Sequence, residues 1–153
     1  MKTYMSSVVV GQEHLDTRRN RNHAGMVGQE KILDEFLADF MAQLDLGLDV
    51  LEKRDQCRFG VTHKETDYRS ELLLGEHVRI DGMVWVSKNR HSLKFLIKFL
   101  NKGKIESTVI QVTMCLIHAG GSTKKMVAIP NLIIATIGED SPPDWLIQPT
   151  STS

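Results

Sequence analysis

Residues 31–44 read KILDEFLADFMAQL and carry the clearest periodic pattern in the chain. Apolar residues recur there every three or four positions, and charged or polar residues fill the positions between them. The apolar positions are Ile32, Leu33, Phe36, Leu37, Phe40, Met41 and Leu44. This spacing predicts one long amphipathic helix, preceded by a polar loop over 11–25 and fading at Gly47.

Outside this helix the apolar residues alternate with polar ones, which is the period of a β-strand. The predicted strands cover residues 4–10, 57–61, 78–86, 93–100 and 105–118, and a last strand ends at Ile129-Pro130. Tight turns are expected at 101–104 and 119–122, so neighbouring strands form an antiparallel meander. One helix and a run of antiparallel strands predict an α+β fold with the helix packed on one face of the sheet.

The segment 93–100 reads LKFLIKFL and places apolar residues on both faces of its strand. Such a strand is covered on two sides, by the helix and by a neighbouring layer or a partner. Because the single helix leaves much apolar surface to cover, we expect a homo-oligomer, either a homodimer or a homotetramer.

The chain has 153 residues, the size of one ordinary domain, and 41% of them are hydrophobic and 25% charged. This composition predicts a packed core and is unlike that of a disordered chain. We expect the folded domain to span residues 1–138. Residues 139–153 are rich in Pro, Ser, Thr and Asp, and we expect them to form a flexible C-terminal tail.

Nineteen basic residues balance nineteen acidic ones, so no overall field exists to attract nucleic acid or an anionic membrane. The sequence shows neither a signal core nor an apolar stretch of membrane-spanning length, and we expect a cytoplasmic protein with neither kind of partner. Cys57 and Cys115 stand without nearby metal-type ligands and are expected to be buried, reduced thiols. No metal site is predicted.

Residues 13–26 read EHLDTRRNRNHAGM and concentrate side chains that can carry chemistry. They stand directly before the predicted helix, whose free N–H groups and positive dipole end can bind an oxygen that gains negative charge. The nearby carboxylate of Asp16 can act as a nucleophile or activate water. These two parts suffice in principle for thioester hydrolysis without a metal or cofactor. Asp, Asn and His are also common in loops and helix caps, so composition alone allows a structural role for Asp16.

The same stretch resembles the signature of the 4-hydroxybenzoyl-CoA thioesterase family of hotdog proteins. In that family an Asp near the end of the first strand precedes, by about seven residues, an Asn, His or similar residue and then Ala. Asp16, His23 and Ala24 occupy these places here. Residues 67–72 (DYRSEL) and 75–78 (GEHV) are similar to the family's segment in which a tyrosine precedes a Gly-acid pair. The resemblance extends over roughly residues 8–134.

The resemblance implies a hotdog fold, in which an antiparallel sheet wraps around one long central helix. It also implies at least a dimer, with an acyl-CoA substrate between subunits and no cofactor other than the CoA of that substrate. Asp16 is then the catalytic carboxylate, as nucleophile or general base. The N–H groups near Gly25 and Met26 polarise the thioester carbonyl, and Asn22 and His23 shape the pocket. The expected reaction is hydrolysis of an acyl-CoA to free acid and CoA.

Several basic residues are candidates for contact with CoA. Lys88 and Arg90, in an expected turn, are predicted to bind the CoA moiety. Arg18, Arg19 and Arg21 are further candidates for its phosphates or for an acidic acyl group, although most exposed charges have no specific partner and a solvated loop is the commoner case.

Two alternatives stay open at this point. As in other hotdog thioesterases, the carboxylate can stand on the helix itself, at Glu30 or Asp34. A hotdog domain can also bind an acyl-CoA or acyl-carrier thioester without cleaving it. The atypical Arg18-Arg19 pair, and Met26 where many relatives carry an aromatic residue, favour that second alternative.

Overall fold

The computed structural model describes residues 1–15, 23–46, 57–101, 106–118 and 125–147 of the chain. In chain order its elements are β1 (Lys2–Val9), η1 (Gln12–His14), β2 (His23–Ala24), α1 (Met26–Gln43), β3 (Cys57–Tyr68), β4 (Leu72–Leu73), β5 (His77–Val86), β6 (Ser92–Leu100), β7 (Glu106–His118), β8 (Lys125–Val127), α3 (Asn131–Ile137) and α4 (Asp144–Ile147). The predicted turn at 119–122, and that at 101–104 apart from Asn101, lie outside the described residues.

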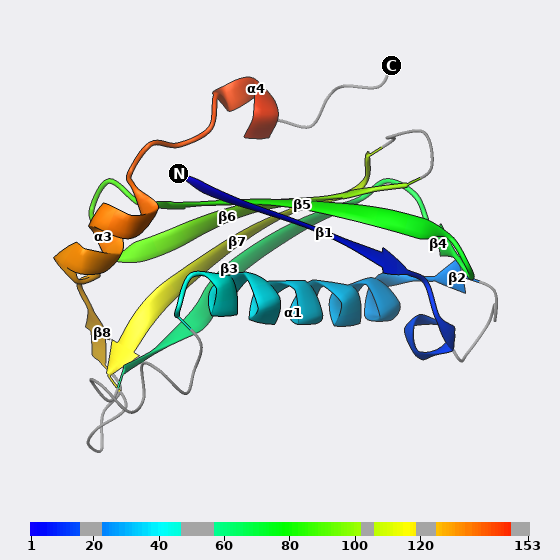
Figure 1. Ribbon diagram of the computed structural model, residues 1–153, viewed down its shortest axis with the longest axis horizontal. Coiled ribbons are helices and arrows are strands. Elements are labelled where there is room, and N and C mark those ends of the chain that lie inside the picture. The colour runs from blue at the N-terminus through cyan, green and yellow to red at the C-terminus, as the bar shows by residue number, and fades with distance from the viewer. Residues whose placement is uncertain (16–22, 47–56, 102–105, 119–124, 148–153) are drawn as a thin grey trace.

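One curled antiparallel sheet forms the body of the fold, with the strand order β1-β5-β6-β7-β3. The predicted meander is confirmed in β5, β6 and β7, which pair consecutively, whereas β1 and β3 pair at opposite edges. β8 pairs with the end of β7, and β2 and β4 form a separate two-stranded sheet. α1 lies along one face of the large sheet (Figure 1), as the α+β prediction requires.

The apolar stripe of α1 is buried against this sheet. Phe36 and Phe40 are 2% and 1% exposed, and their rings contact those of Tyr4 and Phe95 at centroid distances of 5.4 to 5.6 Å. Burial of each such phenylalanine contributes roughly 2–3 kcal/mol. Directly beneath them β5 carries Gly82, where a Cβ would lie 2.7 Å from the Phe36 ring and 2.8 Å from the Phe40 ring.

Helix α1 begins at Met26, five positions before the predicted start. Its first turn hides the helical period because Met26 and Val27 are 64% and 70% exposed and Gly28 has no side chain. β3 likewise continues past the predicted end at Val61 to Tyr68. This half of β3 is a sheet edge with mostly exposed polar residues, which is how edge strands avoid pairing with other chains.

The helices α3 and α4 are not predicted from the sequence. Residues 131–137 read NLIIATI, whose β-branched residues favour strands rather than helices. Packing decides the outcome, since Ile137 is 2% exposed in the core and Gly138, at a φ of 89°, ends the helix. α4 falls within the predicted tail; residues 148–153 lie outside the described part, and the flexibility of the tail stays a prediction.

The strand β6 is buried on both faces, as predicted. Phe95 and Ile97 belong to the core beneath α1, while Leu96, which points the other way, is 1% exposed within the single chain. A second subunit is therefore not needed to cover Leu96, and oligomer formation stays a prediction. None of the helices in the described part of the chain has the length and hydropathy needed to cross a membrane.

The close approach at Gly82 gives a stability prediction. We expect Gly82→Ala to lower the free energy of unfolding by about 1–3 kcal/mol, because the added methyl overpacks two buried rings. Urea unfolding followed by circular dichroism measures this loss. Gly60→Ala is the matched control, since the added methyl there meets only the flexible end of the Ile117 side chain. Equal losses in both variants would contradict the proposed contact.

Candidate functional site

The N-terminus of α1 is open to a ligand. Gly25 is its N-cap, and the helix has neither a side-chain cap bond nor an acidic residue in its first turn. The first backbone bond of the helix runs from the Gln29 N–H to the Gly25 carbonyl, at 3.0 Å. The N–H groups of the three residues before Gln29 therefore lie outside the helical ladder, at the positive end of an 18-residue helix. Such a terminus can stabilise an oxygen that becomes negatively charged.

A cavity of about 290 Å³ adjoins this helix terminus. Its lining residues are Gly25, Met26, Gln29, Tyr68, Arg69, Ser70 and Glu71. One wall is the first turn of α1, and the other is the connection that leaves β3 and enters β4. The cavity therefore brings together two of the segments on which the family resemblance rests, residues 13–26 and 67–72.

The wall opposite the helix is held by β7. The backbone N–H groups of Arg69 and Ser70 both donate to the Ser107 carbonyl, at 2.8 and 3.0 Å. Ser107 is fully buried, and its hydroxyl donates to the Phe99 carbonyl on β6 at 3.1 Å. The connection between β3 and β4 is thus fixed to the central strands of the sheet.

Glu30 stands beside the cavity and is engaged by two donors. Its carboxylate accepts hydrogen bonds from the Lys64 ammonium and, at 3.1 Å, from the Tyr68 hydroxyl. Burial raises the pKa of Tyr68, and the charge of Glu30 and the hydrogen bond to it raise this pKa further. The Tyr68 phenol is consequently a neutral donor at physiological pH.

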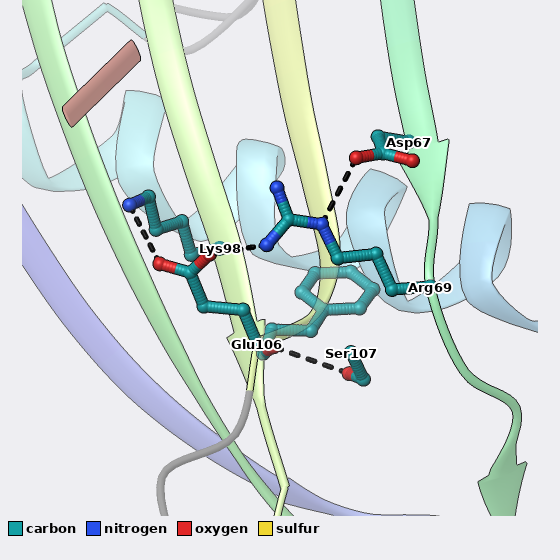
Figure 2. Close-up of polar contacts among 6 residues, drawn as sticks. Asp67, Arg69, Lys98, Glu106 and Ser107 are labelled. Atoms are coloured by element: carbon teal, nitrogen blue, oxygen red, sulfur yellow. Dashed lines mark hydrogen bonds and ion pairs between the residues drawn. The ribbon is translucent and has the colours of Figure 1, made fainter. Parts of the chain in front are cut away.

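A cluster of charged residues lies behind the cavity wall, on the face of the sheet away from α1. Figure 2 shows the Arg69 guanidinium between Asp67 and Glu106, which it reaches at 2.9 and 2.7 Å. Lys98 donates to the other Glu106 oxygen at 2.8 Å. Burial raises the pKa of Glu106, but the hydrogen bonds and charges of Lys98 and Arg69 outweigh it and hold this pKa below its ordinary value.

The segment 16–22 carries the predicted catalytic Asp16 and the pocket residue Asn22, and it lies outside the described residues. Before it, η1 packs against α1, and the Lys31 ammonium donates to the Glu13 carbonyl at 3.2 Å. His14 is 2% exposed, and its Nδ1 accepts the Gly11 N–H at 3.0 Å. Figure 1 shows η1 at the N-terminal end of α1.

The other predicted site residues fall in two places. His23, whose backbone pairs with Leu73 in the small sheet, leads directly into the helix terminus, where Gly25 and Met26 line the cavity. Lys88 and Arg90 lie in the turn between β5 and β6, near the C-terminal end of α1. An 18-residue helix is about 27 Å long, so one chain does not bring this turn to the cavity.

Arg90 also has a partner in its own chain. Its Nε lies 2.6 Å from a carboxylate oxygen of Glu139, and its backbone has a φ of 59°. Among the described residues, no three His, Cys, Asp or Glu side chains gather in a way that could hold a metal ion. The side chains that line the described cavity carry amide, hydroxyl, guanidinium and carboxylate groups.

The model of the thioesterase-like superfamily matches residues 15–137 of the sequence. The chain belongs to this superfamily. The family match covers α1 and every strand of the large sheet except β1, and it includes both walls of the cavity. No curated protein matches the sequence significantly.

Solved structures share the fold of this superfamily member. A hypothetical protein from Staphylococcus aureus, solved in complex with CoA, superposes with a TM-score of 0.78 at 18% identity, over 99% of this chain and 96% of that one. A 1,4-dihydroxy-2-naphthoyl-CoA thioesterase from Synechocystis superposes with a TM-score of 0.75 at 11% identity, over 89% of this chain and 96% of that one. A mutant 4-hydroxybenzoyl CoA thioesterase complexed with 4-hydroxybenzoyl CoA superposes with a TM-score of 0.76 at 8% identity, over 90% of this chain and 100% of that one. At these identities the likeness shows the hotdog fold alone.

The sequence pattern does not single out two residues behind the cavity: Thr108, whose buried hydroxyl donates to the Gln29 amide oxygen, and Glu106, which pairs with Arg69. In the sequence, Thr108 is a polar residue within a long predicted strand, and Glu106 is a charged residue beside a predicted turn. Their roles depend on the register of β7 against β3 and β6, which no local pattern reveals. Arg69 and Glu71 belong to segment 67–72, which only the family resemblance marks as part of a site.

The lowered pKa of Glu106 gives a pH prediction. The Glu106 carboxylate stabilises the fold while it is ionised, so this contribution is complete above pH 5 and is lost as the pH falls through its lowered pKa. We expect Glu106→Gln to lower the free energy of unfolding by about 1–2 kcal/mol at pH 7, and by progressively less below about pH 4. Urea unfolding of both proteins at several pH values between about 3 and 7 measures the difference.

Asp81→Asn is the control for this measurement. The Arg79–Asp81 pair lies on the same sheet but is more exposed, with side chains 48% and 30% accessible, so its loss should cost less than about 1 kcal/mol. If the loss of unfolding free energy in Glu106→Gln does not change with pH, the assigned ionisation of Glu106 is ruled out.

Proposed function

We propose that this protein hydrolyses an acyl-CoA thioester to the free acid and CoA, as members of the 4-hydroxybenzoyl-CoA thioesterase family do. The observation that carries the proposal is the cavity at the uncapped terminus of α1, in a chain of the thioesterase-like superfamily. The neighbours solved with CoA and with 4-hydroxybenzoyl CoA support a ligand of this kind.

In the proposed reaction the thioester carbonyl oxygen faces the free N–H groups of Met26 and the residues after it. Asp16 acts as general base, taking a proton from water while the water oxygen attacks the carbonyl carbon, or as nucleophile, forming an anhydride that water then cleaves. The amides stabilise the negative charge that gathers on the oxygen. The carbon–sulfur bond breaks, the CoA sulfur takes a proton, and the free acid remains. No metal or cofactor takes part.

Both ends of segment 16–22 support this role for Asp16. Leu15 follows η1, which packs against α1, and His23 pairs with β4 immediately before the helix terminus. The described residues on either side of the segment, Leu15 and His23, thus lie beside the N-terminal part of α1. Asn22 and His23 are proposed to shape the pocket there.

The alternative carboxylates on the helix are less suited to this chemistry. Glu30 already accepts hydrogen bonds from Lys64 and Tyr68, which occupy its carboxylate oxygens. Asp34 is exposed to solvent and does not line the cavity. We therefore assign the reaction to Asp16.

The CoA moiety is proposed to bind between subunits of a homodimer or homotetramer. Lys88 and Arg90 are far from the cavity of their own chain, so they would contact CoA bound at the site of another subunit. Their role in binding CoA therefore depends on the oligomer.

The proposed reaction gives a direct kinetic prediction. We expect Asp16→Asn to lower kcat by about two to four orders of magnitude, because the attacking group or the base is lost. The measurement is thiol release from a panel of short, long and aromatic acyl-CoAs. Its controls are Glu30→Gln and Asp34→Asn, which should retain most of the activity, and a thermal unfolding curve that shows the fold to be intact.

Two results would overturn the assignment. Near-normal hydrolysis by Asp16→Asn would remove Asp16 from the mechanism. Tight binding of acyl-CoAs by the unmodified protein, with no thiol released from any of them, would show a binding protein rather than a hydrolase.

A further inference from the structure

We propose that Gln29 is a positioning residue: its buried amide fixes the first turn of α1 against the opposite cavity wall, and so aims the N–H groups that bind the reacting oxygen. This inference rests on the proposed function. The Gln29 side chain is 2% exposed, although it lies in the first turn of a helix beside an open cavity. A buried amide without a structural task would be costly.

The Gln29 amide joins two parts of the chain that are distant in sequence. Its Oε1 accepts a hydrogen bond from the hydroxyl of Thr108 on β7, which is fully buried. Its Nε2 donates to the Ser70 carbonyl, at 3.4 Å, in the connection between β3 and β4. The helix terminus is therefore tied both to the sheet and to the far wall of the cavity.

The orientation of this amide is fixed by its partners. The Ser70 carbonyl can only accept a hydrogen bond, so the Gln29 NH₂ group must face it, and the Gln29 oxygen then faces Thr108. The opposite orientation would direct the Gln29 oxygen at the Ser70 oxygen. Thr108 consequently acts as a donor, and loss of its hydroxyl leaves the Gln29 oxygen buried without that partner.

The other residues of the first turn offer little anchorage. Gly25 and Gly28 have no side chains, and those of Met26 and Val27 are 64% and 70% exposed. Within the described part of this turn, Gln29 is thus the side chain that fixes the helix start to the sheet. Stabilisation of a developing oxyanion depends on donors held within a fraction of an ångström, and a misplacement of about 1 Å can cost about a hundredfold in rate.

The first test replaces the donor. We expect Thr108→Val, which keeps the shape of the side chain, to lower kcat about 10–100-fold with KM close to that of the unmodified protein, because transition-state contacts are lost rather than substrate binding. Thr108→Ser keeps the hydroxyl and should restore most of kcat. Thr113→Val is the matched control: it removes a hydroxyl from the same strand, where its partner is Lys94 rather than the helix.

The second test changes the charge of the amide. In Gln29→Glu an ionised carboxylate repels the Ser70 carbonyl, whereas the protonated acid can donate to Ser70 and still accept from Thr108. We expect the kcat of this variant, divided by that of the unmodified protein, to rise as the pH falls. The titratable groups near residue 29 are Tyr68, Arg69 and Glu71, which line the cavity, and Glu30, which accepts a hydrogen bond from Tyr68. They are present in both proteins, so dividing the two kcat values removes the pH dependence that the proteins share.

Hydrogen exchange of the amides of residues 29–31, the first that are bonded within the helix, supplies a readout that does not depend on activity. Exchange in these amides should accelerate in Thr108→Val and not in Thr113→Val. If the unmodified protein cleaves no acyl-CoA, the proposed function fails, and the exchange result still decides whether Thr108 and Gln29 position the turn. Unchanged exchange and kcat in Thr108→Val, an equal kcat loss in Thr113→Val, no rescue by Thr108→Ser, or a pH-independent ratio for Gln29→Glu would overturn the inference.

Discussion

The structure depends on the contact between α1 and the sheet at Gly82. Phe36 and Phe40 can approach β5 this closely only because residue 82 has no side chain, and the rings of Tyr4 and Phe95 then pack against them. This contact sets how deeply the helix lies in the curled sheet. Because the helix is rigid, the same contact also sets where its N-terminus emerges, beside the connection between β3 and β4.

Apolar packing alone does not fix the first turn of the helix. The buried stripe starts at Gly28 and Gln29, and the two residues before them are exposed. The polar contacts of Gln29 with Thr108 and Ser70 take over where the apolar contacts end. Behind them, the pairing of Arg69 and Lys98 with Glu106 holds together the strands that carry this wall. The fold is thus stabilised by burial along the helix and by directed polar bonds at its start.

Much of this fold could be predicted from residue patterns. The period of 31–44 and the alternation after Cys57 gave the main helix and the central antiparallel strands, because burial on one face imposes those periods. The first turn of α1, the outer half of β3 and the helix α3 could not be predicted, since exposure or packing overrides the pattern there. At the site, Gly25 and Met26 line the cavity and their role in binding a substrate stays a prediction, whereas the place of Thr108 depends on strand register.

The fold and the contacts that select a substrate are separate features, which is why membership of the superfamily leaves the acyl group undefined. The fold supplies the helix terminus and its amides, which in the proposed function bind the thioester carbonyl oxygen whatever chain is attached to it. Selection among acyl chains requires contacts with the chain itself. Met26, which lines the cavity and is 64% exposed in the single chain, is the apolar side chain of the described cavity available for this. Under the proposed function, the environment of Met26 in the proposed oligomer therefore governs which acyl group fits.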